Sequence, residues 1–221
     1  MEAVELRARQ SLHTAGERIA WLHFPLDCVV GVHGLTGQGA STEYGLIGCE
    51  GFTGLSAIFG DSFAVGNAVV VLAGRCRRGA VPVMREGFHR SAAFRRVVTR
   101  YASSRVFQLS QTSLCSMHHP VTRRLSRWLL QAVDRTGSET LPITHDVIAT
   151  ALGVRREAVS LAARRLQSEG AIECGRAHIG VANRRRLEAS ACECYRMLKA
   201  DMERLDRDTR SGDAENGSQA R

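Results

Sequence analysis

The stretch LPITHDVIATALGVRREAVSLAARRLQSEG, from Leu141 to Gly170, predicts two short helices joined by a tight turn. Thr144 is a good N-cap for the first helix, because its hydroxyl can accept a hydrogen bond from a free backbone amide of the first turn. Gly153 can take the left-handed conformation that ends a helix. The apolar face between them recurs at helical spacing and consists of Ile148, Ala149 and Leu152.

The second helix of this stretch begins near Arg155 and has an arginine-rich outer side. Its inward residues are predicted to be Val159, Ala162, Ala163 and Leu166. Its outward residues are predicted to be Arg155, Arg156, Glu157, Ser160, Leu161 and Arg164. This layout is that of a helix-turn-helix, whose second helix enters the major groove of DNA. Two solvated amphipathic helices in an ordinary bundle remain the alternative.

The segment AIECGRAHIGV, which follows Gly170, predicts a small β-hairpin. Two short strands at 172–174 and 178–181 flank Gly175 and Arg176. A helix-turn-helix followed by a hairpin is a winged helix. The tip of this wing would bring Arg176 and His178 to the DNA backbone.

Several segments together resemble a known family. RLSRWLLQAVDRTG (124–137), the helix-turn-helix stretch, LQSEGAI and ACECY (191–195) are similar to the Crp/Fnr family of bacterial transcription regulators. The resemblance is strongest from about His118 to Tyr195, and it extends through WLHFPLD, YGLIGCEGFTGL and SQTSLCSMHHPV in the first half. It implies an α+β fold with an N-terminal antiparallel β jelly roll of the cyclic-nucleotide-binding type, a long dimerisation helix and a C-terminal winged helix.

The chain has 221 residues, enough for one large or two small domains with a proper core. Its formal net charge of +8 favours an anionic partner without identifying it. Between positions 155 and 186, eight arginines stand against three acidic residues, so the positive excess lies in the proposed DNA-binding half. A charge-rich solvated face is the alternative.

Membrane and secretion signals are missing from the sequence. The longest apolar run, Ala68 to Ala73, is too short to span a bilayer, and the N-terminus has no hydrophobic signal core. The seven cysteines have an odd count and no compact spacing pattern, which favours reduced thiols. We therefore predict a cytoplasmic protein with no membrane partner.

Residues 1–90 are rich in glycine and in short β-type runs, as expected for a small antiparallel sandwich or roll. The resemblance makes this region the jelly-roll sensor domain. The helix that usually precedes the roll in the family is short or missing here. From about Arg85 to Met117 the pattern becomes helical, and no proline or glycine interrupts Phe88 to Met117.

A helix of about thirty residues, from Phe88 to Met117, would span about 45 Å, which suits pairing with its copy in a dimer. Segment 91–119 is therefore predicted to be the dimerisation helix and hinge, which ends at His119–Pro120. The residues predicted to be buried against the partner subunit are Phe94, Val98 and Tyr101. A helix that packs only on its own roll is the alternative.

Residues 120–205 are predicted to form the winged helix-turn-helix domain. Val121 to Val133 supplies an amphipathic supporting helix, and Arg186 to about Leu205 a further helix. The tail, residues 206–221, lacks apolar side chains and is predicted to be disordered.

No catalytic or phosphate-binding motif is present, so we predict that the protein is not an enzyme. Cys174 and His178, with Cys192 and Cys194 further on, offer thiolate and imidazole groups. However, the first two lie on opposite arms of the wing, and cysteines two apart point to different sides of a helix. We therefore expect buried small hydrophobes there and no metal site. The pair at 118–119 is expected to serve capping or packing.

The sequence does not identify the effector that the roll would bind. Cyclic-nucleotide binders of the family grip the cyclic phosphate with an Arg-Ser/Thr pair, whereas no arginine lies between Gly51 and Gly74 here. Without that guanidinium the phosphate loses its strongest contact, so we predict no cyclic AMP binding in the usual mode. Oxygen sensors of the family carry an N-terminal cysteine cluster, which this chain lacks. No cofactor is predicted, the effector is unknown, and haem remains open.

The family motif, matched residue by residue, implies that Arg156, Glu157 and Ser160 read bases, since arginine suits guanine and a carboxylate suits the cytosine amino group. The family usually has arginine where this chain has Leu161. The remaining DNA-contacting residues are predicted to be Thr144, Arg155, Arg164, Arg176 and His178.

The predicted function is that of a homodimeric transcription regulator that binds a near-palindromic operator in double-stranded DNA. If it is an activator, RNA polymerase is a further partner. One alternative is a small-molecule-binding roll whose winged helix mediates protein contacts. Another is a metal- or redox-active protein.

Overall fold

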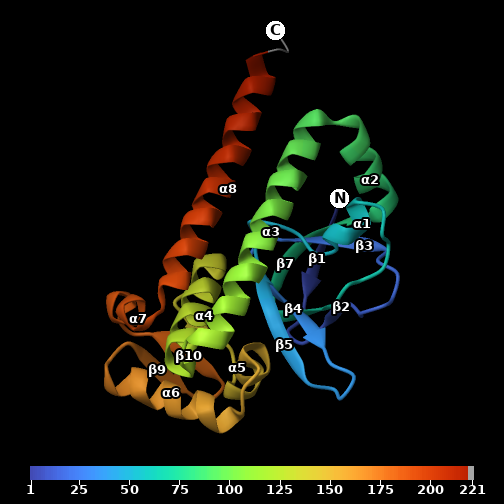
Figure 1. The fold of residues 1–221 in the computed structure, drawn as a ribbon. Coiled ribbons are helices and arrows are strands. Elements are labelled where there is room, and N and C mark those ends of the chain that lie inside the picture. Colours follow the sequence, from blue (N-terminus) through green and yellow to red (C-terminus); the bar gives the residue numbers. More distant parts are fainter. Residues whose placement is uncertain (219–221) are drawn as a thin grey trace.

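The structure is a computed structural model that describes residues 1–218, with side chains through Arg207. An N-terminal β roll is followed by a helical hairpin, a winged helix and a long C-terminal helix (Figure 1). This confirms the predicted α+β fold of roll, long helix and winged helix. Residues 219–221, the end of the predicted tail, lie outside the described residues.

The roll consists of two antiparallel sheets that pack face to face. Its strands are β1 (Glu2–Leu6), β2 (Ser11–His13), β3 (Trp21–Pro25), β4 (Val29–Leu35), β5 (Ser41–Ile47), β6 (Asn67–Leu72) and β7 (Gly74–Ala80). One sheet has the order β1-β7-β3 and the other β2-β6-β4-β5. Leu6 of β1 and Cys76 of β7 share a buried cluster with Val70 of β6, so side chains of both sheets fill the space between them.

Helix α1 (Leu55–Ile58) lies within the roll, and α2 (Val81–Arg90) and α3 (Ala92–His118) follow it. The predicted uninterrupted helix from Phe88 to Met117 is wrong, because the chain turns at Ser91. Ser91 has an extended backbone, and its hydroxyl accepts a hydrogen bond from the Phe94 amide at 3.2 Å. Serine is a preferred N-cap, so its side chain favours a new helix start at this point.

The inner face of α3 covers the roll of its own chain. Val98 and Tyr101 are buried there, and the Tyr101 hydroxyl donates to the Phe52 carbonyl at 2.9 Å. Gly51 makes this approach possible, since a Cβ at that position would lie 2.1 Å from the Tyr101 ring. Phe94 packs half-buried against the same cluster. The chain's own roll thus buries Val98 and Tyr101, contrary to their predicted contact with a partner subunit, whereas the contact predicted for the half-buried Phe94 stays a prediction.

The winged-helix domain contains α4 (Val121–Thr136), β8 (Thr140–Leu141), α5 (His145–Leu152), α6 (Arg156–Ser168), β9 (Ile172–Gly175), β10 (His178–Val181) and α7 (Arg184–Ser190). Its three strands form a sheet in the order β8-β10-β9. The inward residues predicted for the second helix of the helix-turn-helix are all buried, namely Val159, Ala162, Ala163 and Leu166. The sequence pattern thus predicted this core correctly.

The C-terminal helix α8 (Glu193–Ser218) packs alongside α3 (Figure 1). The single helix predicted from Arg186 to Leu205 is in fact two, because the chain breaks between the end of α7 and Glu193. Beyond Asp206, where disorder was predicted, α8 continues to Ser218, since an existing helix gains a hydrogen bond with each residue added. Neither α8 nor any other helix in the described part of the chain is long and apolar enough to cross a membrane.

The roll and the winged helix share one buried interface. Leu46 of β5 belongs to the same core cluster as Trp128 of α4. The Trp128 Nε1–H donates to Oε1 of Glu43 at 3.0 Å, and Nε of Arg135 lies 2.8 Å from Oε1 of Glu50. The Arg135 and Glu50 side chains are only 2% and 13% exposed. Because breaking a buried pair leaves an uncompensated charge, these contacts favour one arrangement of the two domains.

Candidate nucleic-acid interface

The turn between α5 and α6 has the conformation that the sequence predicts. Gly153 is left-handed, with φ of 63°, and its N–H donates to the Thr150 carbonyl at 3.3 Å. The carbonyl of Leu152, at the end of α5, accepts a hydrogen bond from the buried guanidinium of Arg124 on α4. A cation at a helix C-terminus complements the helix dipole. The turn is therefore held from within the domain.

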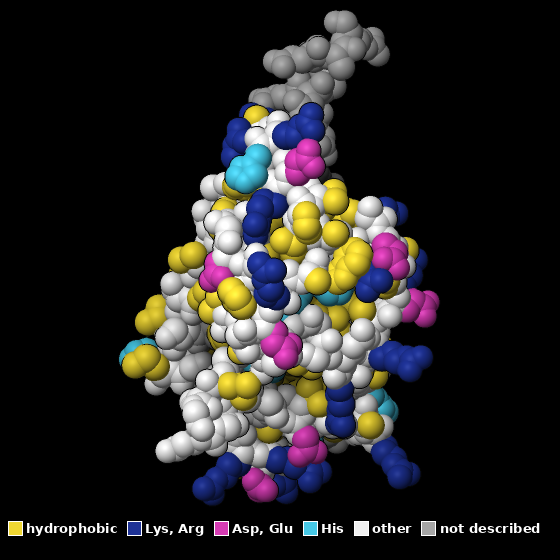
Figure 2. Space-filling view, turned by 90° about the vertical axis from the view of Figure 1, so that its right-hand side faces the viewer, with side chains coloured by type: hydrophobic (Ala, Val, Ile, Leu, Met, Phe, Trp, Pro, Cys, Tyr) yellow, Lys and Arg dark blue, Asp and Glu magenta, His cyan; other side chains and the backbone are white. Residues whose placement is uncertain are grey.

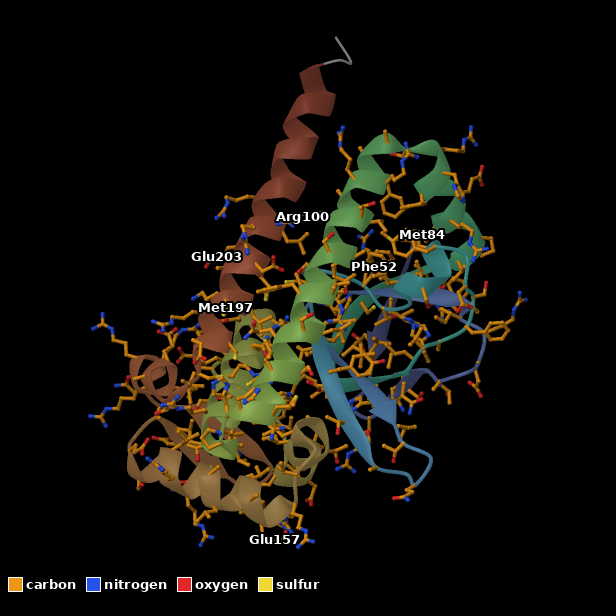
Figure 3. All side chains as sticks on the ribbon, in the orientation of Figure 1. Phe52, Met84, Arg100, Glu157, Met197 and Glu203 are labelled. Carbon is orange, nitrogen blue, oxygen red and sulfur yellow. The ribbon has the colours of Figure 1, made fainter. Side chains whose placement is uncertain are left out.

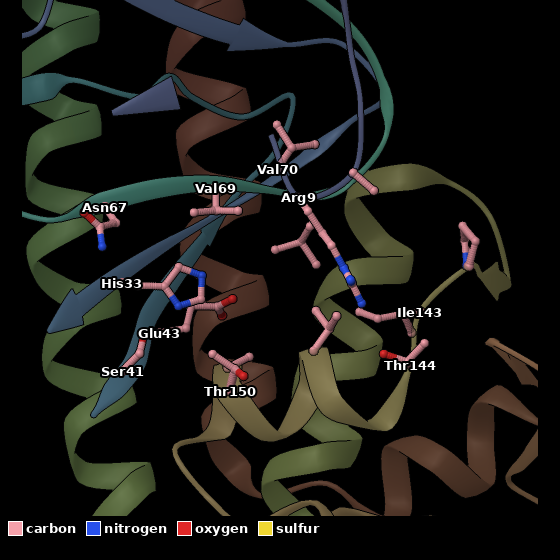
Figure 4. Close-up of a pocket in the computed structure, with 15 residues that line it drawn as sticks. Arg9, His33, Ser41, Glu43, Asn67, Val69, Val70, Ile143, Thr144 and Thr150 are labelled. Atoms are coloured by element: carbon pink, nitrogen blue, oxygen red, sulfur yellow. The ribbon is translucent and has the colours of Figure 1, made fainter. Parts of the chain in front are cut away.

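Thr144 is the N-cap residue of α5, as predicted, but the predicted capping hydrogen bond is not made. Its hydroxyl makes no capping hydrogen bond, and Oγ1 is buried without a hydrogen-bond partner among the described residues. Thr144 instead lines a cavity of about 280 Å³ between the roll and α5, together with Thr150, His33 and Glu43 (Figure 4). Thr144 therefore borders the interdomain cavity.

The outer face of α6 is exposed to solvent, as predicted. Arg155, Arg156, Glu157 and Arg164 are all exposed, and Leu161 is 65% exposed. Glu157 lies at the end of the molecule farthest from the tip of α8 (Figure 3), and Figure 2 shows Lys and Arg side chains gathered at this end. The arrangement presents a helix with basic and polar side chains to an external partner.

Ser160 differs from its neighbours on this face because it is half-buried. Its hydroxyl and Nδ1 of His145 on α5 are hydrogen-bonded at 3.0 Å. Partial burial, and secondly the charge of Arg156, lower the pKa of His145, so the ring is neutral at pH 7. Arg156 in turn lies 3.4 Å from Asp146, an exposed pair that solvent screens. Arg156 is therefore available to bind another anionic or polar group.

The wing projects beside α6 with both predicted tip residues exposed. Arg176 lies in the turn between β9 and β10, and His178 is the first residue of β10. Ala177 adopts a positive φ of 61° in this turn. Glycine takes this conformation more readily than alanine, but the nearby Gly175 is instead part of β9.

A partly buried network holds the wing-side helices on α4. The Arg184 guanidinium donates to Asp134 at 2.5 Å and to the Tyr195 hydroxyl at 2.7 Å. The Tyr195 hydroxyl donates to the second oxygen of Asp134 at 2.8 Å. Three elements, α4, α7 and α8, are thereby joined by reciprocal hydrogen bonds, which positions α6 and the wing on a rigid support.

Comparison with known domains assigns this part of the chain. The Crp-like helix-turn-helix domain family matches residues 123–190. Residues 123–190 therefore form a Crp-like helix-turn-helix domain. A search of curated protein sequences gave no match.

Solved structures of transcription regulators show the same fold across most of this chain. FixK2 from Bradyrhizobium japonicum superposes with a TM-score of 0.74 at 15% identity, covering 86% of this chain and 97% of that one. A CRP-family transcriptional regulator from Thermus thermophilus superposes with a TM-score of 0.70 at 20% identity, covering 86% and 96%. The c-di-GMP-responsive regulator CLP from Xanthomonas campestris gives 0.65 at 14% identity, covering 82% and 94%.

A second cavity, of about 230 Å³, lies between the roll and α3. Arg105 is the only arginine that lines it within the described chain, and its guanidinium donates to the Leu46 carbonyl at 3.2 Å and to Gln108. On another wall, Nε2 of His13 and Oγ1 of Thr53 are hydrogen-bonded at 2.8 Å. Burial, with a smaller effect of His23, lowers the pKa of His13 to about 4, so the ring is neutral.

The cysteines near the C-terminus do not lie as predicted. Cys192 precedes α8 and Cys194 is in its first turn, so the two thiols are not on opposite sides of one helix. Both lie close to Cys115 and His119 at the end of α3. The sequence contained a signal for this group, because Cys115 and His119 are four residues apart at the end of a predicted helix and so share a face.

Proposed function

We propose that the protein is a Crp/Fnr-type transcription regulator that binds a near-palindromic operator as a homodimer, with α6 in the major groove and the wing on the backbone. The observation that supports this most directly is the exposed face of α6, on which Arg156 and Glu157 are free of buried contacts. Arg156 would donate to guanine and Glu157 would accept from cytosine. Arg155, Arg164, Arg176 and His178 would contact phosphates and position the protein. Thr144 remains a weaker candidate because it lines the interdomain cavity.

The dimer contact is proposed on a different face of α3 from that predicted. Val106, Leu109 and Met117 are 62%, 38% and 76% exposed and follow one another at helical spacing. Val106 and Met117 lie away from the residues that contact the roll and α8, whereas Leu109 also lines the cavity between the roll and α3. Pairing of two such helices buries apolar side chains that water would otherwise surround. The two recognition helices would then lie about one DNA turn, ~34 Å, apart.

The signal is proposed to act in the cavity between the roll and α3. A ligand there would contact α3 directly and could shift the dimer helix against the roll. Arg105 already donates to a backbone carbonyl, so a cyclic phosphate would have to displace this contact to gain a guanidinium partner. We therefore propose that the effector is not cyclic AMP. Acting on DNA, the protein would work in the cytoplasm, with RNA polymerase as a further partner if it activates transcription.

Selection of binding sites from random duplex DNA at a stated salt concentration tests the proposal. The expected outcome is an enriched inverted repeat with half-sites about one helical turn apart, bound with a steep salt dependence. Enrichment of a single unrepeated half-site would contradict the dimer. An absence of enrichment would favour a winged helix that binds protein. Calorimetry with cyclic AMP should show no binding in the micromolar range.

A further inference from the structure

Four potential metal ligands meet where α3 ends and α8 begins. Cys115 and His119 come from the end of α3, and Cys192 and Cys194 flank the start of α8. Their ligand atoms all lie within 4.8 Å of one another. Cys115, Cys192 and Cys194 are 0%, 3% and 1% exposed, and the His119 side chain is 15% exposed. We call these four residues the Cys/His cluster.

Two distances within the Cys/His cluster fit the edges of a tetrahedral site. Sγ of Cys115 lies 3.5 Å from Sγ of Cys192, and Sγ of Cys194 lies 3.6 Å from Nδ1 of His119. For zinc bonds of about 2.3 Å to sulfur and about 2.0 Å to nitrogen, tetrahedral angles give S···S edges of about 3.8 Å and S···N edges of about 3.5 Å. The ligand atoms are thus already near the positions that a bound ion requires.

Neighbouring side chains contact the ligands of the Cys/His cluster and orient them, as hydrogen-bond partners of the ligands do at known metal sites. Nε2 of His119, the nitrogen directed away from the thiols, lies 3.2 Å from Oε1 of Glu193. A metal-bound histidine commonly donates its other ring N–H to a carboxylate in this way. On the opposite side, the Gln111 amide donates to Sγ of Cys194 at 3.1 Å. Both contacts favour ligand forms that bind a cation through Nδ1 and Sγ.

Buried positive charge beside the Cys/His cluster points to a negative group there. Arg124 and Arg127 are 8% and 5% exposed, and Nε of each is buried without a hydrogen-bond partner among the described residues. A buried guanidinium is costly unless an opposite charge compensates it. Three thiolates and a neutral imidazole around a divalent ion carry a net charge of −1. Such a site would compensate part of this positive charge.

We propose that Cys115, His119, Cys192 and Cys194 bind one Zn²⁺ ion in a closed tetrahedral site. The ligand set of three sulfurs and one nitrogen is typical of structural zinc. The site would join the end of α3, the hinge at His119–Pro120 and the start of α8. Because α4 follows this hinge directly, the ion would limit how far the winged helix can rotate against the dimer helix.

Zinc content of the full-length protein, purified under reducing conditions, is the first test. We expect one zinc per chain, and loss of nearly all of it in Cys115→Ser, Cys192→Ser and Cys194→Ser. Cys49→Ser, which changes an exposed cysteine outside the Cys/His cluster, is the matched control and should retain full zinc. Zinc-free wild-type protein that stays folded and shows no uptake of added Zn²⁺ would overturn the proposal.

Two further measurements keep the test valid if the serine variants fail to fold. Co²⁺ added to metal-free wild-type protein should give the visible absorption of a tetrahedral S₃N site, and His119→Cys should shift it toward that of an S₄ site. Glu193→Gln should weaken zinc affinity by about 10–100-fold, whereas Glu203→Gln, on the same helix, should not change it. A Cys115–Cys192 disulfide in intact-mass analysis, or iron and sulfide in place of zinc, would contradict the proposed site.

Discussion

The outer face of α6 and the Cys/His cluster are both rich in reactive side chains, but they are made in opposite ways. The α6 face comes from one continuous segment, is exposed, and has few partners within the chain. The Cys/His cluster comes from segments 77 residues apart and is almost fully buried. A binding surface for an external polymer can be built on one helix, whereas a small-ion site needs ligands on several sides. The two therefore respond to substitution differently.

Leu166→Ala and Leu161→Ala compare the two sides of α6 and should give the largest difference in stability. Leu166 is fully buried and Leu161 is 65% exposed. The first change leaves a cavity in the core and should lower the free energy of unfolding by about 2–5 kcal/mol. The second should stay within about 0.5 kcal/mol of wild type. Urea denaturation measures both, and equal losses would mean that α6 is packed on both faces.

Glu43→Gln tests the buried interface between the roll and α4. Burial raises the pKa of Glu43 from 4.5 to about 7, although Trp128 and the positive charges of Arg127, Arg135 and Arg105 oppose this. Between these two values the unfolded state has lost the proton and the folded state has kept it. Stability should therefore fall as pH rises from about 4.5 to about 7, by a total on the order of 3 kcal/mol, and then level off.

The glutamine variant stays neutral and can still accept the hydrogen bond from Trp128, so this fall should disappear. His33, which lines the same cavity, has its pKa lowered by burial and contributes a change of opposite sign. The quantity to compare is therefore the free energy of unfolding of wild type and of Glu43→Gln, measured by denaturation across this pH range. Identical pH dependence in the two proteins would show that Glu43 ionises freely in the folded state.

Glu157→Ala and Arg176→Ala should separate base recognition from phosphate contact. Loss of the Glu157 carboxylate should relax discrimination at one base pair by about 1–3 kcal/mol, since a base-edge acceptor is removed. Arg176→Ala should weaken binding to all sequences alike and reduce the salt dependence. Arg165→Ala, an exposed arginine paired with Glu169, is the control. An unchanged preferred sequence for Glu157→Ala in a binding-site selection would refute its assignment.

Tyr101→Phe should have the smallest effect, because it removes one hydrogen bond and keeps the ring in place. We expect a loss of about 1 kcal/mol in the free energy of unfolding and an unchanged oligomeric state. Val106→Asp, on the exposed stripe of α3, should instead leave the fold intact and produce monomers, because it places a carboxylate in the proposed contact. Sedimentation distinguishes the two. If Tyr101→Phe alone dissociated the dimer, the sequence-based prediction that Tyr101 contacts the partner subunit would be favoured again.

The winged helix could be predicted from the sequence in some detail because its determinants are local. Helical spacing of apolar residues identified the buried side of α6, and Gly153 marked the turn. The exposure of Arg155, Arg156 and Glu157 followed from the same periodicity. Thr144 takes the predicted N-cap position but makes no capping hydrogen bond, since such a bond depends on how the side chain is oriented and not only on its type.

Tertiary structure decided which surface covers each apolar face. Periodicity in α3 indicated that Val98 and Tyr101 are buried, but only the fold shows that the roll of the same chain, and not a partner subunit, buries them. The break at Ser91 depended on a capping bond that competes with helix continuation. The Cys/His cluster required α8 to lie beside α3. A sequence determines which side chains avoid water, whereas contacts between distant segments depend on packing of the whole chain.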